Sequence, residues 1–385
     1  MTETTPSVQD VTEAVDALAA GLRARGPEIE RARRLPADVV AALREAGVFR
    51  LWVPRELGGI EAGPTAVINL LETLAAADGS TGWCSATGLA SNCAGAFLPE
   101  DGARELYPTG GELAGGALMP GGRAVPQPDG SYLVTGRWSF GTGTQHCDWV
   151  IGGAMVAAAD AGGPPSMRAV VLPPAQVQFL DTWHTAGLEG TGSVDYRVED
   201  VRVPAEHTID PANVDPWPSG PMWRIPMLSL IFPLLGAVPL GIARAAVLEL
   251  SALAVAKTPF RSTRSLAERE TAQAASGRAK ALIDAGHLYL CASMESMWAS
   301  AAAGSAPTLP QRAQARLAAV HATQSAAEAV ELCYRTAGST ALYRTSPLQR
   351  YLRDVNAVTQ HYALNATGYD LVGRVLFGMP ADPGL

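Results

Sequence analysis

WHTAGLEGTGSVDYRVEDVRVP, residues 183–204, joins a glycine-rich turn to a stretch of alternating apolar and charged residues. Gly187, Gly190 and Gly192 punctuate its first half. Residues 194–199 then alternate between apolar and charged side chains, which is the period of a strand with one buried face. The stretch therefore predicts a tight turn that feeds a half-buried β-strand.

The sequence on the N-terminal side of this turn holds further short β-rich runs. They are SYLVTGRWSF (131–140), DWVIGGAMV (148–156) and MRAVVLP (167–173), and glycine- or proline-containing turns separate them. Short strands at regular spacing, with no helical pattern between them, are typical of a β-barrel or sandwich. We expect a middle β-domain over residues 113–228.

Helical patterns flank this β-rich region on both sides. Residues 7–26 carry apolar side chains at spacings of three and four, and Ser7 with Asp10 forms a capping pair at their start. Further helices, long enough to pack as a bundle, are expected near residues 234–257, 265–303, 310–337 and 347–376. The predicted fold class is α+β multidomain, with an N-terminal α-helical domain (1–112), the middle β-barrel or sandwich and a C-terminal four-helix bundle (229–385).

The composition indicates a folded protein with a large core and excludes some partners. Hydrophobic residues make up 48% of the 385 residues and charged residues 17%, so disorder is not expected. The net charge is −8 and no basic run is present, and therefore nucleic-acid binding is not expected. Five cysteines without a CxxC motif indicate buried thiols in a reducing compartment.

Two segments bear on the location of the protein. MTETTPSVQD (1–10) has neither a basic nor an apolar run, so we expect no signal peptide and a cytoplasmic protein. Residues 225–243 are uncharged and about long enough to cross a bilayer. They hold Pro226, Pro233 and Pro239, however, so a buried linker running into a core helix is the favoured interpretation and no membrane is expected.

Common catalytic signatures are missing from the sequence. It has no GxGxxG between a strand and a helix, no P-loop motif and no GxSxG, and none of its six histidines lies in an HExxH motif, so a metal site is not expected. In WSFGTGTQHCDW (138–149), Trp138 offers a flat apolar face and Ser139 and Thr142 offer hydrogen-bonding groups. A flavin suits that combination, but so does a tight turn with a core tryptophan, and the residues alone leave both open.

The domain order and four motifs together resemble one family. The motifs are WSFGTGTQHCDW, GLEGTGSVDYRVEDVRVP (187–204), PLGIARAAV (239–247) and AGSTALYRTSPLQRYLRDVNAVTQH (337–361). They resemble the acyl-CoA dehydrogenase fold superfamily. Within it the chain is most similar to the flavin-dependent monooxygenases, the oxygenase components (group D) of two-component systems. The resemblance covers nearly the whole chain.

The resemblance implies an activity, a cofactor and partners. Reduced FMN or FAD would come from a separate flavin reductase. Oxygen would add at flavin C4a, and the resulting hydroperoxide would hydroxylate an aromatic or polyketide-like small molecule. A homotetramer is the expected assembly, with the middle domain covering one side of the flavin and the bundle covering the other.

The resemblance also implies which residues meet the flavin. They are Trp138, Ser139 and Thr142 in the middle domain, and Arg261, Arg264, Gly338 and Ser339 in the bundle. The two arginines lie in the loop KTPFRSTRSL (257–266), which in the family reaches a flavin, often that of a neighbouring subunit; arginine suits its phosphate. Glu189 stands where the family usually has an arginine, so an anion-binding role for the turn at 187–193 is left in doubt.

The catalytic carboxylate of acyl-CoA dehydrogenases has no equivalent at the two positions where the family places it. These positions hold Tyr362 and Ile231 here, and neither side chain can take an α-proton at neutral pH. His361 adjoins the first position, and an imidazole titrates near neutrality, so we predict that His361 is the catalytic acid or base. Ser91 and Asn92 stand where some relatives have a second histidine, and we predict that they hydrogen-bond the substrate.

Some contacts and alternatives complete these expectations. Met119 and Tyr362 are predicted to contact the substrate, and Arg353 with Asp354 to form a structural ion pair. Three other functions stay open at this point. They are oxygenation of nitrogen or sulfur, dehydrogenation with a relocated base such as Glu249, and a non-catalytic bundle protein that no longer binds flavin.

Overall fold

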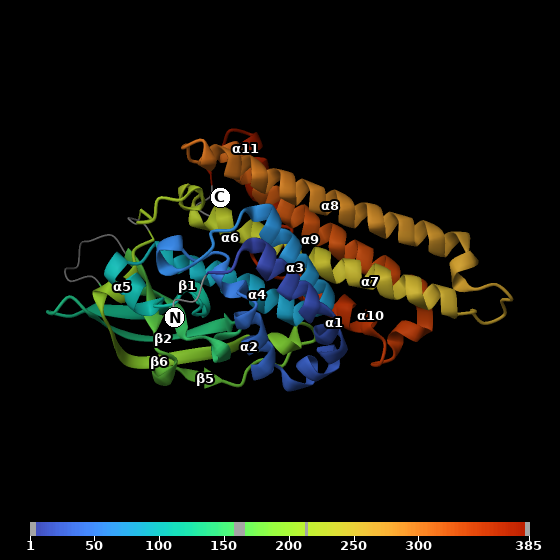
Figure 1. The fold of residues 1–385 in the computed structure, drawn as a ribbon, viewed down its shortest axis with the longest axis horizontal. Helices are drawn as coiled ribbons and strands as arrows, with labels where there is room; N and C mark the ends of the chain where they lie inside the picture. The colour runs from blue at the N-terminus through green and yellow to red at the C-terminus, as the bar shows by residue number, and fades with distance from the viewer. Residues whose placement is uncertain (1–4, 158–165, 212–214, 382–385) are drawn as a thin grey trace.

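Helices, strands and again helices follow one another in the computed structural model, which describes residues 5–157, 166–211 and 215–381. Figure 1 shows the sheet at one end of the long axis, and the longest C-terminal helices extend from beside it to the other end. The N-terminal helices lie between these two parts. The predicted fold class is confirmed: a helical N-terminal part, a middle sheet and a C-terminal set of long helices.

The N-terminal part is helical. Its helices are α1 (Val8–Ala32), α2 (Ala37–Glu45), α3 (Pro64–Ala77), α4 (Gly79–Asn92) and α5 (Glu100–Leu106). α1 begins at the predicted capping pair, because the Asp10 amide donates to Ser7 Oγ and the Ser7 amide donates to Asp10. α4 is rich in small residues, and a Cβ atom added at Gly82 would lie 2.5 Å from the Ala75 Cβ. The small side chains therefore let α3 and α4 lie in close contact.

The middle part is one seven-stranded sheet. Its strands are β1 (Ala114–Pro126), β2 (Tyr132–Gly141), β3 (Trp149–Val156), β4 (Ser166–Leu172), β5 (Gln178–Leu180), β6 (Val194–Val203) and β7 (Thr208–Ile209). Their order is β5-β6-β2-β1-β3-β4-β7, and the pair β1–β3 is parallel. β4 and β6 touch across the three strands between them, and β1, β2, β3, β4 and β6 share one apolar cluster. The sheet therefore curves round its own core like a barrel, and β6 is the predicted half-buried strand.

The C-terminal part is helical, and it begins within the apolar stretch at 225–243. Its helices are α6 (Met227–Leu235), α7 (Ala237–Ala256), α8 (Glu270–Ala302), α9 (Leu309–Ala337), α10 (Pro347–Val358) and α11 (Gly368–Leu376). The apolar stretch forms α6 and the start of α7 rather than a linker. Among the described residues, Met227–Ala256 is the helical stretch long and apolar enough to cross a membrane by length and composition, but 89% of its most apolar window is buried inside the protein.

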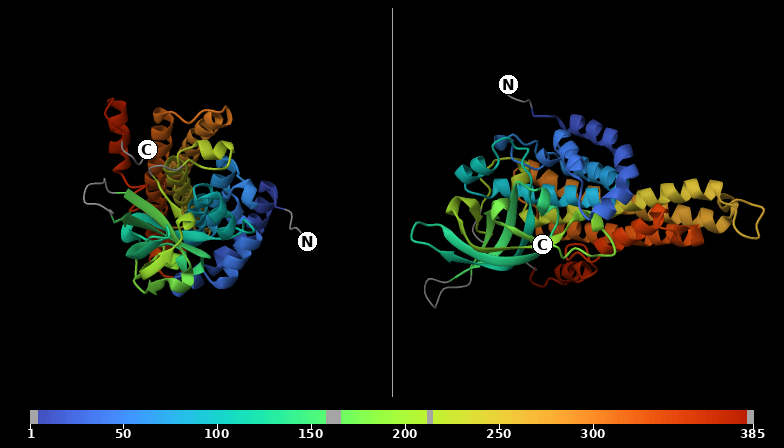
Figure 2. Two further views of the ribbon diagram at one scale, coloured as in Figure 1. Left: turned by 90° about the vertical axis from the view of Figure 1, so that its left-hand side faces the viewer. Right: turned by 90° about the horizontal axis from the view of Figure 1, so that it is seen from below.

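The three parts meet at α4. This helix contacts α3, α6, α7 and α10, and it also contacts β1 and the turn at Glu189–Thr191. Figure 2 shows the sheet and the bundle from two further directions, with the N-terminal helices packed against both. One large apolar cluster joins the N-terminal helices to the bundle, while the sheet keeps a second cluster of its own. Contacts with α4 therefore fix the position of the middle part relative to the bundle.

Candidate active site

Two neighbouring residues of α4, Trp83 and Cys84, contact the two segments that carry the candidate site, which are the segment after α10 and the glycine-rich turn. The ring of Trp83 meets the ring of His361 edge-on, with centroids 5.2 Å apart. Cys84 Sγ donates to the Thr191 carbonyl oxygen, 3.6 Å away, in the glycine-rich turn. α4 therefore brings that turn and the segment after α10 to one place. Trp83 was not predicted from the sequence. It could have been found as a large aromatic side chain in a helix made mostly of small residues.

His361 is a neutral imidazole in the folded protein. Burial lowers the pKa of His361 to about 4, and the charge of Arg316 acts in the same direction. Nδ1 accepts a hydrogen bond of 3.3 Å from the Ala363 amide, so the ring hydrogen of the neutral form belongs on Nε2. The expectation that His361 titrates near neutrality is therefore wrong. The ring presents an Nε2–H donor throughout the physiological pH range.

The lowered pKa of His361 predicts a loss of stability in acid. An unfolded histidine has a pKa of about 6.5, so between about pH 6.5 and pH 4 the unfolded chain binds a proton that folded His361 does not. Stability therefore falls as the pH falls through this window, and at pH 5 His361 accounts for about 2 kcal/mol of that fall. In urea unfolding, we expect His361→Gln to lose about 2 kcal/mol less than the wild type between pH 7 and pH 5. Equal losses in the two proteins would contradict the lowered pKa.

Four aromatic side chains that contact one another lie at the two positions where acyl-CoA dehydrogenases carry a catalytic base. We call them the aromatic wall, and they are Trp83, His361, Tyr362 and Phe232. Phe232, next to Ile231 on α6, meets the Tyr362 ring edge-on at 5.2 Å between centroids. The ring centroids of His361 and Tyr362 are 5.0 Å apart. Tyr362 thus lies beside α6, the helix that carries Ile231, and the two positions hold a phenol and an aliphatic side chain rather than a carboxylate. Met119 is 66% exposed on β1, and its contact with a substrate stays a prediction.

The structure corrects the role predicted for Trp138. Its side chain is 2% exposed, its Nε1 donates to the Gly153 carbonyl at 2.7 Å, and Tyr196 stacks on its ring at 5.2 Å between centroids. Trp138 is therefore a core residue of the sheet and offers no face to a flavin. Phe140, which sequence reasoning missed, is 72% exposed instead. A φ of 63° at Phe140 and a register shift before Gly141 turn it outward, whereas in a regular strand it would share the face of Trp138.

A chain of hydroxyl groups connects the turn after β2 to the glycine-rich turn. Thr142 Oγ1 lies 2.8 Å from Ser193 Oγ, which lies 2.7 Å from Thr191 Oγ1. Thr191 Oγ1 donates to the Leu188 carbonyl at 2.8 Å. Thr191 and Ser193 are buried, whereas Thr142 is half-buried, so the hydroxyl chain is accessible at its Thr142 end. Ser139 is exposed on β2 near that end.

Asn92 is a structural residue, which corrects its predicted contact with the substrate. Its Nδ2 donates to the carbonyls of Phe49 and Glu112, and its Oδ1 accepts from the Ala114 amide. These bonds use both hydrogens of the amide group, and the side chain is buried. Asn92 therefore ties α4 to the start of β1. Ser91 is half-buried on α4, and its contact with a substrate stays a prediction.

Glu189 has a partner of opposite charge inside the protein. Arg353 Nη1 donates to Glu189 at 3.0 Å, and its Nη2 pairs with Glu30 near the end of α1. The predicted pair of Arg353 with Asp354 is therefore wrong, since Asp354 is buried and accepts instead from the Leu188 amide at 2.7 Å. Burial raises the pKa of Asp354 to about 7. Both residues of α10 thus hold the glycine-rich turn in place.

Reversing the charge at Glu189 is expected to destabilise the protein. Glu189→Arg would place a second cation beside Arg353, whereas Glu189→Gln would remove the ion pair without adding repulsion. We expect urea unfolding to show a loss of about 2–3 kcal/mol for Glu189→Arg and of about 1 kcal/mol for Glu189→Gln. Glu199→Arg, on the exposed face of β6, is the matched control and should cost less than about 0.5 kcal/mol. A Glu189→Arg variant as stable as this control would contradict the role of the pair.

The bundle segments predicted to reach the flavin lie together at the far tip of the bundle. Lys257, which follows α7, donates to the Ala337 carbonyl at 2.6 Å and to Thr340 Oγ1 at 2.8 Å. The loop 257–266 is thereby fixed beside the turn that holds Gly338–Ser339. Figure 1 shows the α7–α8 connection at the opposite end of the long axis from the sheet. The structure thus groups the predicted residues of the bundle and separates them from those of the middle domain of the same subunit.

The two arginines of this tip face solvent. Arg261 and Arg264 are both exposed, and the Arg261 guanidinium lies 5.4 Å from the centre of the Phe260 ring. Phe260 is itself 89% exposed. Arg264 donates to the Glu268 carbonyl at 2.6 Å, which steadies the loop. Cations and an apolar ring are therefore presented side by side on one exposed loop.

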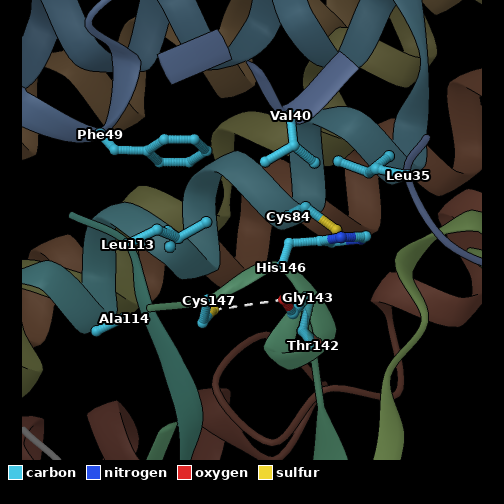
Figure 3. Close-up of a pocket in the computed structure, with 11 residues that line it drawn as sticks. Leu35, Val40, Phe49, Cys84, Leu113, Ala114, Thr142, Gly143, His146 and Cys147 are labelled. Atoms are coloured by element: carbon cyan, nitrogen blue, oxygen red, sulfur yellow. Dashed lines mark hydrogen bonds between the residues drawn. The ribbon is translucent and has the colours of Figure 1, made fainter. Parts of the chain in front are cut away.

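A small cavity and a larger one lie beside the β-domain residues. The first, of about 10 Å³, has room for a single water. Figure 3 shows Cys84 from α4 and His146 from the turn after β2 among the residues that line it. The second, of about 290 Å³, lies between the end of α1 and β5, and Arg33, Phe179 and Trp183 are among its walls. That volume is close to the lower limit for pockets that bind small organic molecules.

Comparison with known proteins agrees with this arrangement. Residues 5–106 match the acyl-CoA dehydrogenase N-terminal domain and residues 234–366 match the acyl-CoA dehydrogenase C-terminal domain. The chain is 34% identical over 378 residues to indole-3-acetate monooxygenase from Pseudomonas putida, which covers 96% of this chain and 95% of the relative. The chain belongs to the flavin-dependent monooxygenases of the acyl-CoA dehydrogenase fold. Its family and its activity as an oxidoreductase are thus as the sequence predicts.

Further relatives of this monooxygenase bear on its cofactor. The flavin-dependent monooxygenase oxygenase subunit HsaA from Mycobacterium tuberculosis is 29% identical over 97% of this chain and 96% of the relative. XiaF from a Streptomyces species, solved in complex with FADH2, has a TM-score of 0.92 and 26% identity over 98% of each chain. The predicted dependence on reduced flavin is confirmed. This monooxygenase is the oxygenase component of a two-component system, which implies a separate flavin reductase.

Proposed function

We propose that this monooxygenase hydroxylates a ring carbon of an aromatic small molecule about the size of indole. The observation that carries the proposal is the aromatic wall of His361, Trp83, Tyr362 and Phe232. Ring edges and faces of this kind bind planar aromatic molecules. The relative named for indole-3-acetate supports a substrate of this size. We further propose that the protein acts in the cytoplasm.

The residues of the middle domain fit a flavin. Phe140 presents an exposed ring, and Ser139 and Thr142 place hydroxyl groups near it. A ring system with an apolar face and a polar edge needs both kinds of contact. The flavin, when bound, supplies the activation of molecular oxygen. The chain supplies the contacts that hold the flavin and the aromatic rings that contact the substrate.

We assign His361 the role of a hydrogen-bond donor rather than of a general base. A base with a pKa of about 4 is poorly matched to proton abstraction at neutral pH. The neutral ring instead offers its Nε2–H to an oxygen of the substrate or to the oxygen being transferred. Trp83 packs edge-on against the ring, and the Ala363 amide fixes Nδ1. These contacts orient the donor before the substrate arrives.

We also propose a homotetramer in which the tip of the bundle completes the site of a neighbouring subunit. Arg261 and Arg264 are exposed and suited to phosphate, yet the tip lies far along the molecule from the sheet of its own subunit (Figure 1). Exposed apolar side chains of the bundle favour contacts with further copies of the chain. They are Leu248, Val255, Phe260, Leu288, Leu342 and Tyr343.

A binding and coupling measurement tests the proposed function. Reduced FMN and reduced FAD would each be titrated into the protein without oxygen, with ultrafiltration to separate free flavin. The tighter flavin would then be supplied by a reductase with NADH, in air, with and without indole-3-acetate or indole. We expect reduced flavin to bind and the yield of hydrogen peroxide per NADH to fall when an accepted aromatic compound is present. Binding of neither reduced flavin would contradict the proposal.

A further inference from the structure

The hydroxyl chain beside the flavin site has one consistent arrangement of hydrogens. Each hydroxyl has a single hydrogen to donate. Thr191 gives its hydrogen to the Leu188 carbonyl, which is 2.8 Å away and can only accept. Ser193, 2.7 Å from Thr191, must therefore donate to Thr191, because two oxygens at that distance repel when no hydrogen lies between them. Thr142, 2.8 Å from Ser193, then donates to Ser193.

The inner end of this chain is held by the fold. Leu188 has a φ of 51°, and its amide donates to buried Asp354 on α10 at 2.7 Å. Its carbonyl also accepts from Trp183 Nε1 at 3.1 Å and from the Thr191 amide at 3.1 Å. These bonds fix the carbonyl oxygen beside the Thr191 hydroxyl. The direction of hydrogen donation is therefore set in the interior and runs inward from Thr142.

Thr142 consequently has no hydrogen left to give a ligand. Its oxygen, at the accessible end of the chain, can only accept a hydrogen bond. A reduced flavin ring carries an N–H group at N5, whereas the oxidised ring has an acceptor lone pair on the same atom. An accepting hydroxyl is complementary to the reduced ring and opposes the oxidised one, since two acceptors in contact leave both unsatisfied.

We propose that Ser193 and Thr191 are positioning residues that make the Thr142 hydroxyl an acceptor and thereby select reduced over oxidised flavin. The inference rests on the proposed function, in which Thr142 meets the flavin ring. Selection of this kind lets the oxygenase take up flavin in the state in which a reductase delivers it. It also favours release of the flavin once it has been oxidised.

The test is the ratio of the dissociation constants of oxidised and reduced FMN, measured without oxygen by ultrafiltration. FAD replaces FMN if the wild type binds reduced FAD more tightly. We expect a ratio above about ten in the wild type, the effect of one matched hydrogen bond. In Ser193→Ala the Thr142 hydroxyl is free to donate, so the ratio should fall about tenfold. Thr142→Val should also lower it, whereas Thr142→Ser, which keeps the hydroxyl, should preserve it.

A matched control and distinct outcomes keep the test decisive. Thr135→Val, on β2, removes a hydroxyl that bonds Asp200 at 2.9 Å and is not part of the hydroxyl chain, so it should leave the ratio unchanged. Thr142→Val alters only the half-buried end, so it serves even if Ser193→Ala does not fold. A wild-type ratio near one, or an unchanged ratio in either a folded Ser193→Ala or Thr142→Val, would overturn this inference and leave the proposed function standing. A wild type that binds neither flavin would overturn both.

Discussion

His361→Ala is expected to lower the rate of aromatic hydroxylation by about 10²–10³-fold. The variant removes the Nε2–H donor that the aromatic wall orients, and it leaves the residues of the β-domain turn in place. We therefore expect the affinity for reduced flavin to change by less than about threefold, a difference below 1 kcal/mol. Oxygen should still be consumed and should appear as hydrogen peroxide instead of hydroxylated product. The measurement is product and peroxide per NADH at saturating reductase.

Two further variants identify what is lost in His361→Ala. His361→Gln keeps an N–H donor on a side chain of similar length and is expected to recover about tenfold of the rate. His321→Ala removes a histidine of α9 that contacts Tyr289 in the bundle, and it should leave the coupling unchanged. Full hydroxylation by His361→Ala would contradict the assignment of the donor.

The double variant Arg261→Ala/Arg264→Ala is expected to weaken flavin binding by about 10²–10⁴-fold. Each arginine that contacts a phosphate contributes a charge-assisted hydrogen bond worth about 1.5–3 kcal/mol. Since the tip belongs to the site of a neighbouring subunit in our proposal, mixed oligomers should behave in a characteristic way. Co-expression of this double variant with His361→Ala should restore activity at about a quarter of the sites, those that draw both intact halves from different subunits.

Complementation between subunits separates this arrangement from one within a single chain. Each chain of the mixture lacks one half of the site, so a site built within one chain would never contain both intact halves. No recovery in mixed oligomers of confirmed composition would contradict the shared site. The control is a mixed oligomer of His361→Ala and wild-type subunits. Its activity shows the effect of replacing some wild-type subunits when no complementation is needed.

Local features of the fold could be predicted because they depend on short spacings. The capping pair of Ser7 with Asp10 opens α1, and residues 187–203 form the turn and strand that their glycines and alternation indicate. The motif around His361 predicted a helix over residues 347–376, but the structure ends α10 at Val358 and begins α11 at Gly368, so His361 lies in the segment between them, beside Trp83. The pKa of His361 could not be predicted, because burial and the charge of Arg316 come from segments far away in the sequence.

The wrong predictions share a physical cause. Phe140 rather than Trp138 is exposed because the strand departs from regular geometry between them, which residue alternation does not reveal. The hydrogen-bonding groups of Asn92 are occupied by carbonyl and amide groups from two other segments, at Phe49 and at residues 112–114. Arg353 and Asp354 are adjacent in sequence but point to different partners across domain boundaries. Each of these features depends on contacts that exist only once the chain is folded.

The central claim is that this chain transfers one atom of molecular oxygen to an aromatic ring at the expense of reduced flavin. It is tested most directly with the purified protein, a flavin reductase, NADH and indole under ¹⁸O₂, followed by mass spectrometry of the products. We expect a hydroxylated product that carries a single heavy oxygen atom from the gas and none from water. Recovery of all the consumed oxygen as peroxide across a panel of indoles and phenols, or a product that takes its oxygen from water, would contradict oxygen transfer to an aromatic ring.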